Sequence, residues 1–185
     1  MRIVGGRLRG RPLAGPTTDA IRPTSDRLRE AIFNVLAHAY DDPITAARVI
    51  DLFAGTGAMG LESMSRGASY VLFVDGGAAA RGLIRQNVEA LGLGGATRLF
   101  RRDATRMGPA APNTPFSLVF CDPPYGRDLA RPALTSCAEG GWLEPGALVV
   151  VEEDAAAELS WPAGFEEIER RTYGDTQVAF GRYRG

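Results

Sequence analysis

The sequence predicts an α/β fold in which a mostly parallel sheet carries helices on both faces. From residue 48 onward, short apolar runs of strand length alternate with amphipathic or alanine-rich stretches of helix length. This alternation is typical of βαβ units. A glycine turn directly follows the first apolar run, as expected between a strand and a helix. Two β-like runs end the chain and indicate an antiparallel hairpin at one edge of the sheet.

A smaller extension precedes the sheet. Residues 2–13 alternate short apolar and basic pieces around a Gly-Gly pair, which predicts a small hairpin, with a flexible arm as the alternative. A helix then begins after Thr24 or Ser25, either of which can cap it because a hydroxyl accepts a hydrogen bond from a free N–H of the first turn. The Asp-Asp-Pro sequence of residues 41–43 ends this helix.

The remaining elements follow from the apolar periodicity. Five apolar runs are expected to form the parallel strands, three stretches between them the helices, and two final runs the hairpin. Three acidic residues, 152–154, begin at the last residue of the fifth run and are expected to form a solvated loop at the carboxyl edge of the sheet. In chain order the strands are 48–53, 70–75, 97–101, 117–121 and 147–152, the helices are 59–66, 78–91 and 128–138, and the hairpin runs are 165–171 and 177–183.

Length and composition predict one domain with a modest extension, which we divide as 1–43 and 44–185. Of the 185 residues, 45% are hydrophobic and 23% charged, enough for a real core. The chain has no lysine, which excludes a P-loop. Its two cysteines and one histidine predict neither a disulfide framework nor a metal site. No signal peptide or membrane-spanning run is evident, so we expect a cytoplasmic monomer with no membrane partner.

Basic residues are concentrated near the N-terminus. The net charge of the whole chain is −1, yet residues 1–29 contain seven arginines and two acidic residues. Such a local excess of positive charge is a footprint for phosphate that the net charge hides. The candidate nucleic-acid contacts are Arg7, Arg9, Arg11, Arg22, Arg27 and Arg29.

Gly55, Gly57 and Gly60 form a G-x-G-x-x-G turn between a strand and a helix. Such a turn lets a ligand approach the backbone closely at a helix N-terminus. Asp75 ends the next apolar strand, twenty residues after Gly55, where a carboxylate binds ribose hydroxyls. The pattern fits S-adenosylmethionine and equally fits a nicotinamide or flavin.

Asp51 favours S-adenosylmethionine. It lies near the end of the first strand, where a carboxylate attracts the sulfonium and ammonium groups of that cofactor and repels a pyrophosphate. The alternative is a structural acid that binds the glycine loop. Asp103 follows the third strand and is expected to accept from the adenine amino group, with the Ala104 amide nearby, or else to cap a helix or pair with a neighbouring arginine. The candidate cofactor residues are Asp51, Ala54, Gly55, Gly57, Asp75, Asp103 and Ala104.

A second motif, Asp122-Pro123-Pro124-Tyr125, follows the fourth strand. An exocyclic amine on a nucleobase is a poor nucleophile, because its lone pair is delocalised into the ring. A carboxylate and a backbone carbonyl that accept its two N–H bonds favour pyramidalisation, and prolines hold such carbonyls in a fixed direction. The aromatic ring offers a face on which an extruded base can stack. The two motifs together predict a metal-independent methyl transfer to a base amino group, with these four residues as the catalytic set.

The chain resembles a known family. Its motifs occur in order along nearly the whole chain, and together they resemble the bacterial RsmD-type 16S rRNA guanine-N2 methyltransferases, named for guanine 966. The segments that carry the resemblance are 4–11 (VGGRLRGR), 22–34 (RPTSDRLREAIFN), 51–60 (DLFAGTGAMG), 122–125 (DPPY) and 173–176 (YGDT).

The resemblance implies a class I S-adenosylmethionine-dependent methyltransferase fold, Rossmann-like and seven-stranded, with an N-terminal extension that holds rRNA. It implies methylation of the guanine 2-amino group during assembly of the small ribosomal subunit. One departure is Gly76-Gly77, where relatives often carry a charged residue after the ribose-binding acid; this leaves the partners of Asp75 open.

Three alternatives remain. The catalytic motif equally suits adenine N6 in DNA or RNA, and only the arginine-rich N-terminus argues for rRNA. A nicotinamide-dependent oxidoreductase would explain the glycine turn with Asp75, but would leave the second motif unexplained. A non-catalytic RNA-binding module would not need the intact Asp122.

Overall fold

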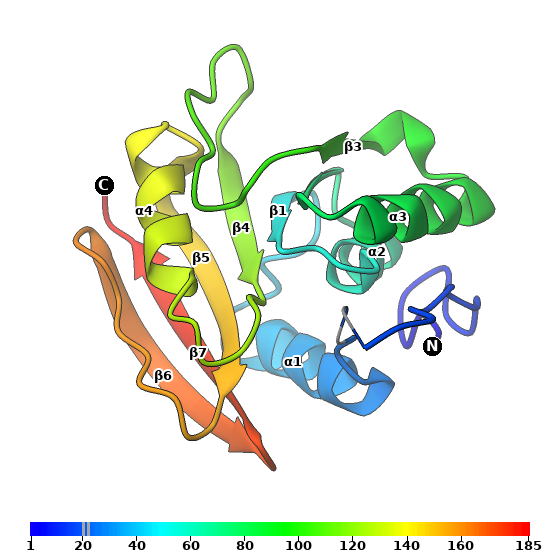
Figure 1. The fold of residues 1–185 in the computed structure, drawn as a ribbon, viewed down its shortest axis with the longest axis horizontal. Helices are drawn as coiled ribbons and strands as arrows, with labels where there is room; N and C mark the ends of the chain where they lie inside the picture. Colours follow the sequence, from blue (N-terminus) through cyan, green and yellow to red (C-terminus); the bar gives the residue numbers. More distant parts are fainter. Residues whose placement is uncertain (20, 22) are drawn as a thin grey trace.

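The computed structural model describes residues 1–19, 21 and 23–185. Within this part of the chain, seven strands form one sheet in the order β3-β2-β1-β4-β5-β7-β6 (Figure 1). Strands β1 to β5 pair in parallel, and β7 pairs antiparallel with β5 and β6. The mostly parallel sheet with its antiparallel C-terminal hairpin is therefore confirmed. The strands are β1 (Arg48–Leu52), β2 (Tyr70–Val74), β3 (Thr97–Phe100), β4 (Phe116–Cys121), β5 (Leu143–Asp154), β6 (Phe165–Tyr173) and β7 (Thr176–Tyr183).

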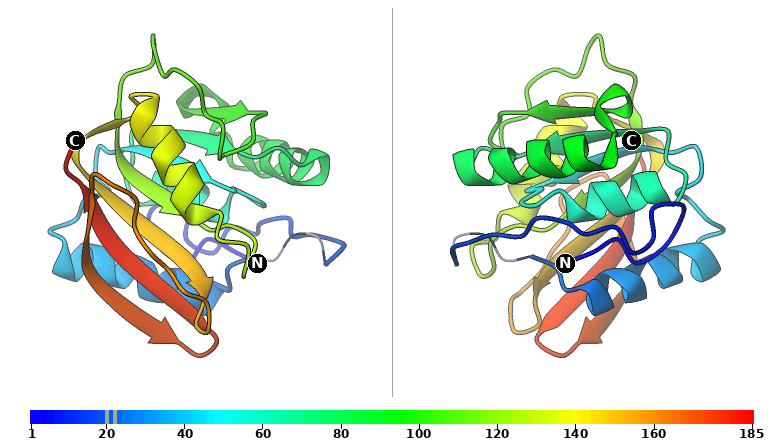
Figure 2. Two further views of the ribbon diagram at one scale, coloured as in Figure 1. Left: turned by 60° about the vertical axis from the view of Figure 1, so that its left-hand side comes forward. Right: turned by 90° about the vertical axis from the view of Figure 1, so that its right-hand side faces the viewer.

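Helices cover both faces of the sheet because successive residues of a buried strand point to opposite faces. Val49 of β1 belongs to the core beneath α1, α2 and α3, whereas its neighbour Ile50 belongs to the core beneath α4. Figure 2 shows α4 and α1 on opposite sides of the strands. The helices are α1 (Asp26–Ala39), α2 (Ala58–Ser65), α3 (Ala78–Leu91) and α4 (Ala130–Glu139), with a short 3₁₀ turn at Gly94–Ala96.

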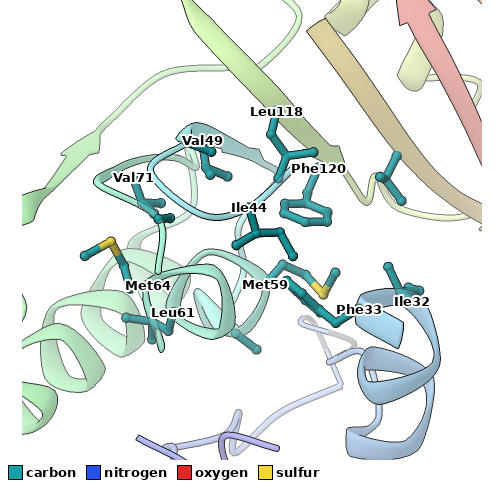
Figure 3. Close-up of a cluster of buried hydrophobic side chains, with 14 of the residues drawn as sticks. Ile32, Phe33, Ile44, Val49, Met59, Leu61, Met64, Val71, Leu118 and Phe120 are labelled. Carbon is teal, nitrogen blue, oxygen red and sulfur yellow. The ribbon is translucent and has the colours of Figure 1, made fainter. Parts of the chain in front are cut away.

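Helix α1 joins the extension to the main core. Ser25 caps it, since its Oγ accepts a hydrogen bond from the N–H of Leu28 at 3.1 Å, which confirms one of the two predicted caps. Ile32 and Phe33 are fully buried on its inner face. The ring of Phe33 lies 5.5 Å from that of Phe120 on β4, within the cluster drawn in Figure 3.

Residues 2–13 fold back on themselves as predicted, although without regular strands. An isolated antiparallel bridge pairs Arg2 with Pro12, and backbone hydrogen bonds join the two arms from Ile3 to Arg11 and from Leu13 to Met1, both at 2.9 Å. The loop also binds α2: Val4 and Gly5 donate to the Glu62 carboxylate at 3.0 and 2.9 Å, and Arg7 donates to the carbonyl of Ser65 at 2.9 Å. The loop is therefore held both by its own backbone and by the main domain.

Strand β5 is longer than its apolar run predicts. Pairing with β7 carries the strand to Asp154, so that Glu152 and Glu153 are opposite Val178 and Gln177. Both glutamates are buried. The expectation of a solvated loop at 152–154 is therefore wrong, because the antiparallel neighbour extends the ladder beyond the apolar residues.

Arg29 is a buried structural residue, so the prediction that it contacts RNA is wrong. Its side chain has no exposed surface and forms an ion pair with Glu62, which is equally buried, with Nε 3.1 Å from Oε1. It also donates to Asp26 at 2.9 Å and to the carbonyls of Thr24 and Arg2. One guanidinium thus links the N-terminal loop, α1 and α2.

We predict that Arg29→Ala lowers the free energy of unfolding by about 3–5 kcal/mol, because it leaves the Glu62 charge buried with less compensation. The matched control is Arg27→Ala, two residues earlier on the same helix, where the side chain is exposed and the expected change is within about 0.5 kcal/mol. Urea denaturation followed by circular dichroism measures both. Equal effects of the two substitutions would contradict this role for Arg29.

Candidate active site

The carboxyl ends of β1, β2, β4 and β5 open onto a cavity of about 640 Å³. Parallel α/β sheets bind ligands at this edge. The segment before α1 forms the opposite wall, so the extension contributes to the cavity. Both predicted motifs reach it. The sequence-predicted residues that line it are Asp51, Ala54, Gly55, Asp75, Asp122, Pro123, Pro124 and Tyr125.

The glycine turn shapes this cavity in two ways. Gly57 does not line the cavity but begins α2 with φ of +81°, a left-handed conformation that favours glycine. Gly60 allows α2 to approach the sheet, since a Cβ there would lie 2.4 Å from the ring of Phe73 and 2.7 Å from Val71. The two glycines therefore direct the N-terminus of α2 at the cavity.

Asp51 lies at the base of the cavity and is only 2% exposed. Its Oδ2 accepts a hydrogen bond from the Gly60 N–H at 2.9 Å. Burial, and to a lesser extent the charges of Asp75 and Glu152, raises the pKa of Asp51 to about 8. The residue thus binds the glycine loop, as the structural alternative expects, and also gives the cavity a carboxylate that a cationic ligand would stabilise.

Asp75 is held at the rim by the two loops beside it. Its Oδ2 accepts from the Gly55 N–H at 2.9 Å, and its Oδ1 accepts from the Gly77 N–H at 2.8 Å. A carboxylate oxygen can accept more than one hydrogen bond, so both oxygens retain capacity for ribose hydroxyls. The Gly76-Gly77 departure therefore supplies a partner for Asp75 through its backbone.

Asp103 and Ala104 do not line the cavity. Asp103 is exposed, and its Oδ1 accepts from the backbone N–H and the hydroxyl of Thr105 at 2.9 and 2.7 Å. These hydrogen bonds lower its pKa. Its loop adjoins the Asp75 loop, because a Cβ at Gly76 would lie 3.9 Å from the Asp103 nitrogen. The adenine contact of Asp103 stays a prediction.

Asp122 and Glu152 form a pair of neighbouring carboxyl groups. They follow Cys121 and Val151, which are register partners in β4 and β5. The Thr24 hydroxyl, from the segment before α1, lies 2.9 Å from Glu152 Oε2 and 3.2 Å from Asp122 Oδ2. Burial, then the charge of Glu152, raises the pKa of Asp122 well above its usual range.

Tyr125 is oriented by the C-terminal hairpin. Its hydroxyl is 2.9 Å from Oγ1 of Thr176, which directly follows the turn of residues 174–175 between β6 and β7. The next residue, Gly126, donates to Glu153 at 3.0 Å. The segment after Asp122 is thus held at both sides, and its aromatic ring lines the cavity.

Sequence reasoning missed three residues of this site, Thr24, Glu152 and Thr176. Glu152 carried a signal: it continues an apolar run at the carboxyl end of a strand, the position that singled out Asp75 and Asp122. Thr24 was expected only as a possible helix cap and instead contacts the two carboxyl groups.

The arginine candidates occupy different environments. Arg7, Arg9, Arg11 and Arg27 are exposed, and Arg11 donates to the Ala90 carbonyl at 2.8 Å. Arg22 lies outside the described residues. Among the residues that the structure describes, no three or more potential ligands are arranged so that they could hold a metal ion. In the same part of the chain, no helix has the length and apolarity needed to cross a membrane.

Comparisons with known proteins agree with the family resemblance of the sequence. The chain matches the family described as "Conserved hypothetical protein 95" over residues 1–182. The Escherichia coli (strain K12) protein named Ribosomal RNA small subunit methyltransferase D is 36% identical over 185 residues, covering 100% of this chain and 89% of the relative.

Solved structures show the same fold. The Escherichia coli protein yhhF is similar with a TM-score of 0.82 and 32% identity, covering 100% of this chain and 98% of that one. An RNA methyltransferase from Salinibacter ruber, solved in complex with S-adenosyl-L-homocysteine, is similar with a TM-score of 0.66 and 13% identity, covering 88% and 94% of the two chains. The class I methyltransferase fold predicted from the sequence is confirmed.

We predict that Asp51→Asn removes a pH-dependent loss of stability. The pKa of Asp51 is about 8 in the folded protein against an ordinary value of 3.8, so stability from this group is lost as pH rises through that window. Relative to wild type, Asp51→Asn gains about 1–3 kcal/mol of unfolding free energy between pH 5 and pH 8. Denaturation at both pH values measures the difference. A difference that does not change with pH would contradict the assignment.

Proposed function

Since this chain belongs to the family described as "Conserved hypothetical protein 95", we propose that it transfers a methyl group from S-adenosylmethionine to the exocyclic 2-amino group of a guanine in 16S rRNA. The observation that carries the proposal is one cavity lined by both Asp51 and Asp122. The name of the Escherichia coli relative supports rRNA of the small subunit as the substrate. The same name favours RNA over DNA as the substrate.

The residues on the β1 and β2 side of the cavity suit the cofactor. Asp51 offers a buried carboxylate to a cation, and Asp75 offers oxygens to ribose hydroxyls at the rim. Ala54 and Gly55 line the wall between them. Asp103 and Ala104 would bind the adenine only from the adjoining loop. When bound, S-adenosylmethionine supplies an electrophilic methyl carbon.

The residues on the β4 side suit the base. Asp122 and the Pro123 carbonyl would accept the two N–H bonds of the amino group, which frees the nitrogen lone pair for attack. Tyr125, held by Thr176, would stack on the extruded base. The nitrogen forms a bond to the methyl carbon as the carbon–sulfur bond breaks, and the proton that the nitrogen loses passes to Asp122 or to water. Most of the rate then comes from positioning and electrostatics.

The extension would hold the RNA. Arg7, Arg9 and Arg27 are exposed, and Arg27 and Tyr173 line a second cavity beside the first, with Thr176 shared between them. An arginine beside a base-binding cavity, as Arg27 is, suits the phosphates that flank an extruded nucleotide. We therefore propose residues 1–43 as an RNA-binding extension of the catalytic domain at 44–185.

The test of this function is radiolabelled methyl transfer to small-subunit particles from a strain that lacks the enzyme, with the modified nucleoside identified by mass spectrometry. We predict N2-methylguanosine, and a loss of about 100- to 1,000-fold for Asp122→Ala, because the amino group loses one of its two acceptors. Affinity for S-adenosyl-L-homocysteine is expected to change little. N6-methyladenosine as the product, or equal loss of activity and cofactor affinity, would contradict the proposal.

For the extension, we predict that Arg7→Ala with Arg9→Ala weakens RNA binding and lowers the slope of log affinity against log salt by about 1–2, since each phosphate contact releases counterions. Arg131→Ala with Arg184→Ala removes the same charge from exposed positions outside the extension and serves as the control. Filter binding across a salt series measures both. An equal change in the two double variants would contradict the proposal that the extension contacts the RNA.

A further inference from the structure

Glu152 is a buried carboxylate that the proposed chemistry does not yet use. It ends the apolar part of β5, is 4% exposed and lines the cavity next to Asp122. Placing two carboxyl groups side by side in a partly closed cavity is costly, because like charges repel and burial removes water from both. Side by side on the cavity wall, the two groups offer acceptors to a ligand with two neighbouring hydrogen-bond donors.

The Thr24 hydroxyl lies between the two carboxyl groups, 2.9 Å from Glu152 and 3.2 Å from Asp122, which shows how close together they lie. The two carboxyl groups also interact directly, which contributes to the raised pKa of Asp122. A ligand with adjacent N–H groups would place one donor against each carboxyl group.

Guanine has this pattern and adenine does not. The edge of guanine that carries the 2-amino group also carries N1–H, so donors stand on neighbouring atoms. In adenine the atom next to the amino-bearing carbon is N1 with a lone pair, which repels an ionised carboxylate. A carboxylate is an acceptor only, so the second acidic group discriminates between the two bases.

We propose that Glu152 selects guanine by accepting its N1–H while Asp122 accepts from the 2-amino group. The inference rests on the proposed function and names the residue that sets its base specificity. Thr24 would position the Glu152 carboxylate, so a residue of the extension contributes to the recognition of the base as well as to the wall of the cavity.

The test replaces the target guanosine, once mapped with the wild-type enzyme, by 2-aminopurine riboside in the same RNA. This analogue keeps the 2-amino group but has a lone pair at N1. Wild type is expected to methylate guanosine at least about 10- to 100-fold more efficiently than the analogue, because an unmatched polar edge is strongly rejected. Glu152→Gln is expected to reduce this ratio by about the same factor, since its carboxamide can donate to the N1 lone pair.

Glu153→Gln is the matched control. Glu153 is the next residue, equally buried, but it does not line the cavity and accepts instead from Gly126 and Asp154. Its substitution is expected to change the rates for both bases alike and leave their ratio at the wild-type value. The ratio, rather than the rate, separates base selection from a structural role.

Two outcomes would overturn the proposal. One is a Glu152→Gln enzyme that loses activity on both bases equally. The other needs no variant: wild type that methylates 2-aminopurine as efficiently as guanosine has no group reading N1–H. Both differ from failure of the proposed function, in which wild type methylates no guanosine at all.

Discussion

The proposed function depends on carboxyl groups concentrated at one edge of a parallel sheet. One cavity is lined by three of them, which lie at or near the carboxyl ends of neighbouring strands: Asp51, Asp122 and Glu152. Burial and mutual repulsion raise the pKa values of Asp51 and Asp122. A cationic ligand and a base rich in donors would each stabilise these carboxyl groups in their ionised form. The proposed cofactor and the proposed base together provide this.

A second buried cluster differs from the cavity because it contains charges of both signs. Arg29 and Glu62 are fully buried, but they neutralise each other and share hydrogen bonds with the N-terminal loop. This pair fixes the extension on α2 and so brings the segment with Thr24 over the carboxyl edge of the sheet. The structural ion pair and the acidic cavity are therefore linked: the first positions one wall of the second.

Most of the fold could be predicted from the sequence, because buried strands and helices leave clear apolar periodicity. The helix at 78–91 has the predicted ends, and Ser25 caps α1 as expected. The hydrogen bonds from the N-terminal loop to α2 could not be predicted, because Glu62 and Ser65 lie far away in the sequence. The prediction that Arg29 contacts RNA was wrong for the same reason, since its partner Glu62 is recognisable only once the chain is folded.

The candidate site was predicted in its outline and not in its detail. Spacing placed Asp51 and Asp122 at the same sheet edge because the carboxyl ends of parallel strands meet there. Glu152 ends the predicted fifth strand but was expected in a solvated loop; the pairing of β5 with β7 continues past it, and the residue is buried. Asp103 was expected to accept from the adenine amino group; in the structure its carboxylate accepts from Thr105 and does not line the cavity, so the adenine contact stays a prediction.

The most direct test of the central claim is calorimetric titration of the wild-type protein with S-adenosyl-L-homocysteine and with NAD. An acidic cavity beside the glycine turn suits a ligand that carries an ammonium group and opposes a pyrophosphate. The account predicts binding of S-adenosyl-L-homocysteine and none of NAD. Binding of NAD without S-adenosyl-L-homocysteine would contradict it.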